Sequence, residues 1–209
     1  MAQVYSSTET GPLSTALPPE DALAHPGSVG SPAPGVRLRL VAAAGAEVVP
    51  GQVGEIHLQA PKLMRGYQRL PAGTGFVDGW FATGDLAWAD AAGRLRVVGR
   101  SMDLIISGGE NIHPAEIENL ATGWPGVAEA AVVGLPDLRW GEVPVLALVA
   151  QPGAVVDVPG LRAHLASQLA RFKQPRRITS VVALPRTALG KVQKPLLLRL
   201  LLQQVSNPP

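Results

Sequence analysis

Residues 99–118 carry the clearest indication of chemistry in this chain, and they read G-R-S-M-D-L-I-I-S-G-G-E-N-I-H-P-A-E-I-E. We expect a short apolar strand at 104–106, a turn at 107–109 and a helix that begins at Pro114. Two adjacent glycines lack Cβ atoms, so the backbone of such a turn can come close to a ligand. An ordinary corner between a strand and a helix would show the same three features.

Two further segments contain charged residues in turn-like contexts, W-F-A-T-G-D-L at 80–86 and L-P-R-T-A-L-G-K-V-Q-K at 184–194. Asp85 follows an expected Thr-Gly turn, and its carboxylate can accept hydrogen bonds from the two vicinal hydroxyls of a ribose. The alternative is an aspartate that caps the backbone of its own turn. Lys191 stands after Gly190, which would let a loop place the ammonium freely.

With Y-S-S-T-E-T at 5–10, these segments resemble, in order, motifs of the adenylate-forming acyl-CoA synthetases, the AMP-binding superfamily. The wording is most similar to aryl-CoA ligases that act on halobenzoates and succinylbenzoate. The resemblance implies a two-step reaction that uses ATP, Mg²⁺ and coenzyme A. A small carboxylic acid first forms an acyl-adenylate with release of pyrophosphate, and the thiol of coenzyme A then displaces AMP.

The resemblance also assigns roles to single residues in adenylate formation. Lys191 is the catalytic ammonium that stabilises charge on the phosphate oxygens. Thr8 and Glu9 hold the AMP phosphate and the metal ion, and Glu9 is the metal ligand. Tyr5, Asp85 and Arg100 bind the nucleotide. The plainer alternatives are a solvated loop lysine for Lys191 and a surface salt bridge for Arg100.

Coenzyme A contacts are implied for six residues: Ser107, Gly108, Gly109, Trp140, Phe172 and Lys173. The loop formed by Ser107, Gly108 and Gly109 reaches the active site in the thiolating pose. Trp140 lines the path of pantetheine, and Phe172 and Lys173 contact the nucleotide end of coenzyme A. Nearby Arg171, Arg176 and Arg177 provide cations for a phosphate. The alternative for Trp140 is a half-buried tryptophan without a ligand. The alternative for the basic residues around Phe172 is a solvated basic face.

Two positions depart from the family pattern. Met102 occupies the expected pivot of the mobile carboxyl-terminal domain, where relatives have Asp or Lys. An unbranched side chain tolerates a change of dihedral angles, and its apolar surface can favour one pose over another. Ser6 replaces the glycine that usually follows the tyrosine.

Composition restricts the class of protein. The 209 residues include 18 Lys and Arg, 16 Asp and Glu and no cysteine. No leader and no 18-residue apolar span are evident, so we expect a cytoplasmic protein without a membrane partner. The leucine-rich run 196–202 suits a packed terminal helix better than an interfacial membrane anchor, because Arg199 is its only cation.

Charge is unevenly distributed, because nine Lys and Arg and no Asp or Glu follow Asp157. Nucleic acid is not expected as a partner, because Phe172 is the only aromatic residue in this basic tail. Proteins that bind single strands by base stacking use several aromatic side chains. A phosphorylated small ligand fits the tail better.

The expected fold class is α/β in the α+β sense, with two domains. Residues 1–100 should form a small β-barrel-like sheet subdomain, the carboxyl-terminal portion of the large AMP-binding domain. Residues 101–209 should form the small mobile α+β domain that carries the lysine. We expect strands at 36–41, 53–58, 94–98, 127–133, 143–149 and 178–184. We expect helices at 114–121, at 159–170 and at the carboxyl terminus.

Length adds a further expectation, because 209 residues hold only about the last two-fifths of such a synthetase. No G-x-x-x-x-G-K-[ST] segment is present. We therefore expect a fragment that is inactive alone, whose missing amino-terminal domain is encoded upstream or supplied by a partner chain. A stand-alone carboxyl-terminal domain acting in trans on a separate AMP-binding partner is the second hypothesis. A nucleic-acid or structural protein using the basic tail is the third. The identity of the acid cannot be inferred from these residues.

Overall fold

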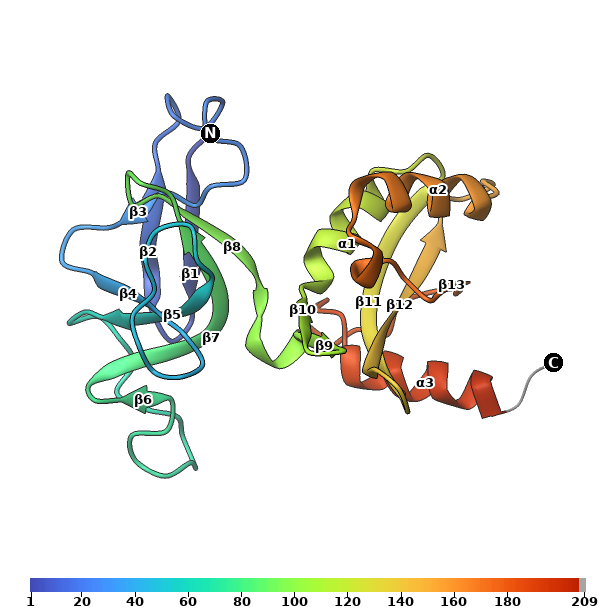
Figure 1. The fold of residues 1–209 in the computed structure, drawn as a ribbon. Helices are drawn as coiled ribbons and strands as arrows, with labels where there is room; N and C mark the ends of the chain where they lie inside the picture. Colours follow the sequence, from blue (N-terminus) through green and yellow to red (C-terminus); the bar gives the residue numbers. More distant parts are fainter. Residues whose placement is uncertain (207–209) are drawn as a thin grey trace. The chain divides into compact units, whose positions relative to one another are not determined.

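The computed structural model describes residues 1–206, and the chain divides into two compact units, Met1–Met102 and Asp103–Pro209. Figure 1 shows both units, which are described separately below. The predicted division lies between residues 100 and 101, two residues before the boundary of the structure. The 3₁₀ turn η1, Ser101–Asp103, contains that boundary.

Unit 1 consists of two antiparallel sheets (Figure 1). The first has the order β1-β2-β3, and its strands are β1 Gln3–Ser7, β2 Gly11–Leu17 and β3 Ser31–Pro32. The second has the order β4-β5-β7-β6, with β8 paired to β7. Its strands are β4 Arg37–Val41, β5 Gly54–Gln59, β6 Phe76–Val77, β7 Trp80–Ala89 and β8 Leu95–Arg100. A bridge between Gly30 and Leu95 joins the two sheets, so the unit is barrel-like as predicted.

The core of unit 1 is built from alternating side chains of the second sheet. In β5, Ile56 and Leu58 are fully buried, and Leu40 of β4 joins them. The intervening positions of β5 are polar, as the two-residue period of a strand allows, and of these His57 is also buried. Tyr5 of β1 packs against this core from the first sheet, which fixes the ring that carries a candidate site hydroxyl.

Unit 2 has one sheet of five strands with helices on both faces. The strand order is β10-β9-β12-β11, and β13 pairs in parallel with β12. The strands are β9 Ile105–Ser107, β10 Glu110–Ile112, β11 Val127–Asp137, β12 Gly141–Ala150 and β13 Arg177–Ser180. The helices are α1 Pro114–Thr122, α2 Val158–Gln168, the 3₁₀ turn η2 Arg171–Lys173, and α3 Lys194–Ser206.

The middle parts of β11 and β12, residues 131–133 and 143–148, are buried on both faces, which explains why these stretches are apolar. Val132 packs in the cluster with α1 and α2, whereas its neighbour Val133 packs in the cluster with α3. Figure 1 shows α1 and α2 on one side of β11 and β12, with α3 on the other. A continuous apolar run is typical of strands covered on both faces.

The predicted fold class is confirmed, and most predicted elements are present with shifted ends. The predicted face of α2 is correct, because Leu161, Leu165 and Leu169 are all buried. The last predicted strand, 178–184, is too long, because β13 ends at Ser180 and Leu184 packs beneath α3 instead. The structure adds β1, β2, β3, β6, β7 and β10, which were not predicted as strands. No helix in residues 1–206 has the length and apolar content needed to cross a membrane.

Candidate functional site

Asp85 of β7 lies at the centre of the candidate nucleotide site of unit 1, and it is only 8% exposed. The Tyr5 hydroxyl donates to its Oδ2 at 2.6 Å, and Arg100 Nε donates to its Oδ1 at 3.0 Å. Asp85 and Arg100 face each other in the pairing of β7 with β8. A carboxylate has about four acceptor positions. Two therefore remain for hydroxyls of a ligand.

A bulge in β7 determines where Asp85 points. Glu55 pairs with Leu86 and His57 with Ala82, so residues 83–85 of β7 lie opposite Ile56 alone. Thr83 Oγ1 donates to the Ile56 carbonyl at 2.9 Å, and the Gly84 N–H donates to Glu55 Oε1 at 2.9 Å. The predicted Thr-Gly turn is therefore wrong. The segment is a bulge inside a ten-residue strand, and bulges redirect single side chains.

Thr8 and Glu9 lie at the tip of the β1–β2 hairpin, which hydrogen bonds hold in one conformation. The Ser7 N–H donates to Thr10 Oγ1 at 2.8 Å. The Met64 N–H donates to the Glu9 carbonyl at 2.8 Å, and the Tyr67 hydroxyl donates to Glu9 Oε1 at 3.2 Å. Thr8 is exposed. The hairpin thus presents a hydroxyl and a carboxylate from adjacent residues.

Electrostatics keep Tyr5 protonated and Glu9 ionised. Burial, followed by the hydrogen bond to Asp85, raises the pKa of the Tyr5 hydroxyl above its ordinary value. Glu9 has its pKa lowered, mainly by a hydrogen bond from its own backbone N–H, with further hydrogen bonds from Ser7 and Tyr67. At neutral pH Tyr5 is therefore a donor and Glu9 an anion.

The donor set for a metal ion is small. Within the described part of the chain, no three His, Cys, Asp or Glu side chains gather into a cluster that could hold one. Mg²⁺ is commonly held by one or two carboxylates together with the phosphates of a substrate. The single ionised carboxylate of Glu9 fits that arrangement and does not fit an all-protein site.

Ser107, Gly108 and Gly109 belong to the β9–β10 hairpin of unit 2. Ser107 pairs with Glu110, so the loop is a hairpin turn and the strand β10 precedes the helix. The Gly108 N–H donates to the Trp140 carbonyl at 2.8 Å. A Cβ on Gly108 would lie 2.7 Å from Trp140 Cε3, and φ of Gly108 is +61°. The structure therefore requires glycine where the hairpin contacts Trp140.

A groove of about 840 Å³ extends from this contact across unit 2. Four of the residues predicted to contact coenzyme A line it: Ser107, Gly108, Trp140 and Phe172. Four arginines also line it, of which Arg171 and Arg176 were predicted as phosphate-binding cations and Arg139 and Arg162 were not. The Arg139 guanidinium lies 4.8 Å from the centroid of a Trp140 ring. An aromatic surface among cations suits a flat, anionic ligand.

Lys173 and Gly109 are not among the residues that line this groove. Both carboxylate oxygens of Glu116 on α1 accept from Lys173 Nζ, at 2.8 and 2.9 Å. The Lys173 ammonium lies 5.9 Å from the Phe172 ring centroid. Phe172 thus lines the groove, whereas Lys173 next to it is paired with Glu116 and joins η2 to α1.

Lys191 is carried by a hydrogen-bonded loop. Arg186 pairs with Val192, the Thr187 N–H donates to the Lys191 carbonyl at 2.8 Å, and the Gly190 N–H donates to the Thr187 carbonyl at 2.9 Å. Arg186 also donates to the Gly190 carbonyl and pairs with Glu129 of β11. The loop that carries Lys191 is therefore ordered, and Gly190 serves this closed turn with φ of +84°.

The Lys191 side chain itself is exposed. Three other lysines in the chain have partners: Lys62 donates to the Leu13 carbonyl, Lys173 pairs with Glu116, and Lys194 pairs with Glu118. In residues 1–206, no hydrogen bond or ion pair engages the ammonium of Lys191. Within the described residues, the Lys191 ammonium is thus an unpaired cation carried by an ordered loop.

Met102 is 82% exposed and is the last residue of unit 1. Its side chain is not buried in either core.

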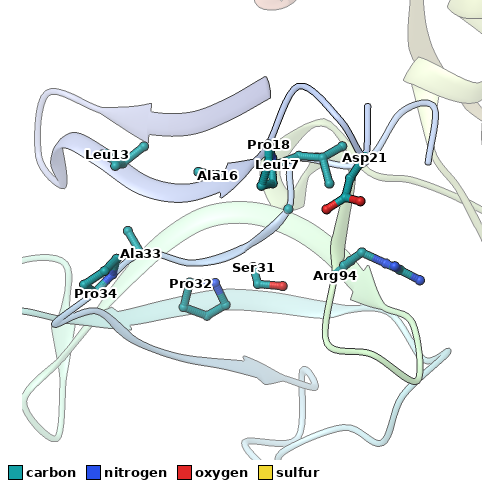
Figure 2. A pocket seen from close by; sticks show the side chains of 11 residues that line it. Leu13, Ala16, Leu17, Pro18, Asp21, Ser31, Pro32, Ala33, Pro34 and Arg94 are labelled. Carbon is teal, nitrogen blue, oxygen red and sulfur yellow. The ribbon is translucent and has the colours of Figure 1, made fainter. Parts of the chain in front are cut away.

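Another cavity, of about 370 Å³, lies in unit 1 beside β2 and the segment 30–34 (Figure 2). Its walls are mostly Leu, Ala and Pro, and Asp21 and Arg94 lie at one end. None of the predicted site residues lines it, so the candidate chemistry is elsewhere.

Comparison with protein families matches both parts of the chain. Residues 1–68 match the AMP-binding enzyme family, and residues 116–191 match the AMP-binding enzyme C-terminal domain. The chain belongs to the AMP-binding enzymes. It spans about two-fifths of the length of the curated AMP-binding enzymes that it matches, for example 38% of one and 39% of another.

Individual AMP-binding enzymes are similar over nearly the whole chain. The indoleacetate–CoA ligase of Aromatoleum aromaticum is 46% identical over 93% of this chain and 38% of its own length. The o-succinylbenzoate CoA synthetase of Bacillus subtilis, in complex with its acyl-adenylate intermediate, has a TM-score of 0.88 and 36% identity, over 94% of this chain and 40% of its own. A second structure of that synthetase, with ATP and magnesium, has a TM-score of 0.86 and 36% identity, over 93% of this chain and 40% of its own length.

Several residues that contact the candidate sites were not predicted, and three of them carry a polar or charged side chain that matters for the chemistry. Tyr67 contacts Glu9, while Arg139 and Arg162 line the groove. Arg139 is next to Trp140, so a search of the flanking residues would have found it. Tyr67 and Arg162 are far in sequence from the residues they accompany, and no local pattern indicates them.

Proposed function

We propose that this chain is the carboxyl-terminal portion of an acid–CoA ligase and provides part of both half-reactions. The observation that carries the proposal is the unpaired ammonium of Lys191 on a closed loop, which is the property of a cation reserved for a ligand. The family supports it, because AMP-binding enzymes activate carboxylates through an adenylate.

In the first half-reaction, a carboxylate oxygen of the acid attacks the α-phosphorus of ATP. The bond from that phosphorus to the pyrophosphate oxygen breaks, and acyl-adenylate and pyrophosphate form. Negative charge increases on the phosphate oxygens, and Lys191 is positioned to offset it. Magnesium, when bound, supplies positive charge that neutralises the phosphates, and Glu9 with Thr8 would hold it there.

Unit 1 would bind the nucleoside. The two ribose hydroxyls would donate to the acceptor positions that Tyr5 and Arg100 leave open on Asp85. Hydrogen bonds to a charged acceptor contribute about 1.5–3 kcal/mol each when shielded from water. Because Tyr5 and Arg100 already orient the carboxylate, little further ordering accompanies binding.

In the second half-reaction, the sulfur of coenzyme A attacks the acyl carbonyl carbon, and AMP leaves with the electrons of the broken bond to oxygen. The groove of unit 2 would hold coenzyme A. Phe172 would stack on the adenine, the arginines would bind phosphate, and pantetheine would pass Trp140 and the Gly108 turn. Met102 would be the pivot that changes poses.

The acid is proposed to be a small, aromatic carboxylic acid. Support comes from the indoleacetate–CoA ligase and the o-succinylbenzoate CoA synthetase, both of which act on acids that contain a ring. The 209 residues contain no glycine-rich phosphate loop, so we propose that they do not catalyse adenylation by themselves. Positioning of phosphates contributes much of phosphoryl-transfer catalysis.

The test uses a joined enzyme, in which residues 1–209 follow the part of the Bacillus subtilis o-succinylbenzoate CoA synthetase that they do not match. We expect it to form o-succinylbenzoyl-CoA from the acid, ATP and coenzyme A, whereas residues 1–209 alone should not exchange pyrophosphate with ATP. A folded joined enzyme without either half-reaction would contradict the proposal. So would exchange by residues 1–209 alone.

A further inference from the structure

Two hairpin tips of unit 2 meet at the groove, and hydrogen bonds join them. The Gly108 N–H of the β9–β10 hairpin donates to the Trp140 carbonyl of the β11–β12 hairpin at 2.8 Å. Beside this bond, Ser107 pairs with Gly141. Each tip contributes residues to the lining of the groove, so the junction of the two tips forms one of its walls.

Asp137 holds the tip of the β11–β12 hairpin in one conformation. It pairs with Gly141, so the loop between the two strands is only the three residues 138–140. Its Oδ1 accepts from the Arg139 N–H and from the Trp140 N–H, both at 2.9 Å. Gly141 follows with φ of +77°, which suits a three-residue hairpin loop. One carboxylate oxygen therefore fixes the backbone of two consecutive residues.

The two residues that Asp137 holds belong to the groove, although Asp137 does not. Arg139 and Trp140 both line it, and Asp137 is not among the lining residues. The Arg139 guanidinium lies 4.8 Å from the centroid of a Trp140 ring, and Gly108 packs so closely on that ring that a Cβ would lie 2.7 Å from Cε3. Trp140 is still 36% exposed. Its ring is therefore ordered and accessible to a ligand.

Charge indicates what kind of contribution Asp137 makes. Hydrogen bonds from the Trp140 and Arg139 N–H groups lower the pKa of Asp137, and the positive charges of Arg176 and Arg139 lower it further. At neutral pH Asp137 is therefore an anion. A negative charge near the groove repels an anionic ligand, so a favourable effect of this residue on binding is geometric.

We propose that Asp137 is a positioning residue for coenzyme A, because it holds Arg139 and Trp140 in their binding geometry before the ligand arrives. The inference rests on the proposed function of the groove. Side chains that are already ordered lose less entropy when a ligand binds. Ordering one side chain on binding reduces affinity about 2- to 13-fold. Loss of Asp137, which leaves two side chains to be ordered, should therefore weaken binding of coenzyme A on the order of 5- to 150-fold.

The experiment measures two properties of the 209-residue chain, its affinity for coenzyme A by calorimetry and its backbone ¹⁵N order parameters without ligand. In Asp137→Ala, the order parameters of the Arg139 and Trp140 amides should fall from the rigid value of about 0.85 to below about 0.6, and the affinity should fall as stated above. Asp137→Asn keeps an acceptor oxygen without the charge. It should keep both amides rigid and should bind coenzyme A at least as tightly as the unchanged chain.

Asp90→Ala is the matched control, because Asp90 forms a similar turn at the tip of the β7–β8 hairpin in unit 1. Its Oδ1 accepts from the Ala92 N–H at 2.9 Å and from the Arg94 N–H at 3.0 Å. Asp90→Ala should leave the affinity for coenzyme A and the amides of residues 139 and 140 unchanged.

Rigid Arg139 and Trp140 amides in folded Asp137→Ala, or equal affinities of Asp137→Ala and Asp137→Asn for coenzyme A, overturn the proposal. If Asp137→Ala does not fold, Asp137→Glu replaces it, because that variant keeps the charge and moves the carboxylate by one methylene. It should also weaken binding, and unweakened binding overturns the proposal. If the unchanged chain does not bind coenzyme A, the proposed function of the groove is wrong. The order parameters alone then decide whether Asp137 positions the two residues.

Discussion

The hydroxyl of Tyr5 donates a hydrogen bond of 2.6 Å to Oδ2 of Asp85, which lies 80 residues further along the chain. This bond links β1 of the first sheet to β7 of the second. It orients a buried carboxylate whose other oxygen is bound by Arg100. The same contact therefore contributes to the stability of unit 1 and to the proposed ribose site.

Tyr5→Phe should lower the free energy of unfolding of unit 1 by about 1–3 kcal/mol at neutral pH, because a charged acceptor loses its donor. The pKa of Tyr5 is raised in the folded state above 10.0. Above pH 10 the unfolded chain therefore loses this proton first, and the free energy of unfolding of the unchanged chain falls by up to about 1.4 kcal/mol per pH unit.

Urea unfolding of both proteins between pH 7 and 11 measures the difference. The unchanged chain should lose more stability than Tyr5→Phe above pH 10, so the two curves should converge. Curves that stay parallel would show that the Tyr5 proton is not held by the fold.

Gly108→Ala should impair both the fold near Trp140 and the second half-reaction. The new Cβ would lie 2.7 Å from Trp140 Cε3. Gly93→Ala is the matched control, because Gly93 has a φ of +77° and open space around its missing Cβ. Each variant should lose about 1–2 kcal/mol from the left-handed backbone.

Only Gly108→Ala should show an additional loss from the contact, together with a higher KM for coenzyme A in the joined enzyme. Thermal unfolding and the coenzyme A dependence of thioester formation are the measurements. Equal effects of Gly108→Ala and Gly93→Ala on thermal stability and on the KM for coenzyme A would argue against the proposed pantetheine path.

The groove of unit 2 should prefer coenzyme A to 3′-dephospho-coenzyme A. A hydrogen-bonded cation contributes about 1.5–3 kcal/mol, so calorimetry on residues 1–209 should show about 10- to 150-fold weaker binding without that phosphate. Arg176→Gln should reduce the preference, whereas Arg199→Gln, which does not line the groove, should keep it. Equal affinity for both compounds would show that the arginines are only a solvated face.

The family and the fold class were easier to predict from sequence than the geometry around the candidate site residues. Local patterns were sufficient for the helices, because Pro114 begins α1 and the leucine spacing of α2 defines its buried face. The bulge at residues 83–85 was missed because its cause is non-local. It depends on Glu55 and Ile56 of β5, which contact residues about 30 positions later in the chain.

Ion pairs were the least predictable part of the site. Lys173 and Lys191 both lie near proline and arginine in sequence, yet within the described residues Lys173 is bound by Glu116 and the Lys191 ammonium is not bound. The difference arises because α1 packs beside η2, which only the tertiary structure shows. For the same reason Lys194, inside the L-P-R-T-A-L-G-K-V-Q-K segment, was not distinguished from an ordinary helix residue.

Met102→Pro in the joined enzyme should impair thioester formation more than adenylate formation. Proline fixes φ near −65° and restricts Ser101 before it, so the proposed rotation would be blocked. In a single turnover, acyl-adenylate should accumulate and coenzyme A should fail to discharge it. Met102→Ala is the control and should turn over both steps, since it removes the side chain and leaves the backbone free. Unchanged rates in Met102→Pro would place the pivot elsewhere.

Lys191→Ala in the joined enzyme, with each half-reaction measured separately, tests the central claim most directly. We expect acid-dependent pyrophosphate exchange to fall by about 10²- to 10³-fold, the usual effect of removing one preorganised charge donor. Thioester formation from supplied acyl-adenylate should be retained, and Arg199→Ala should leave both steps unchanged. Equal losses in the two half-reactions, or no loss in exchange, would contradict the assignment of Lys191 as the cation of adenylate formation.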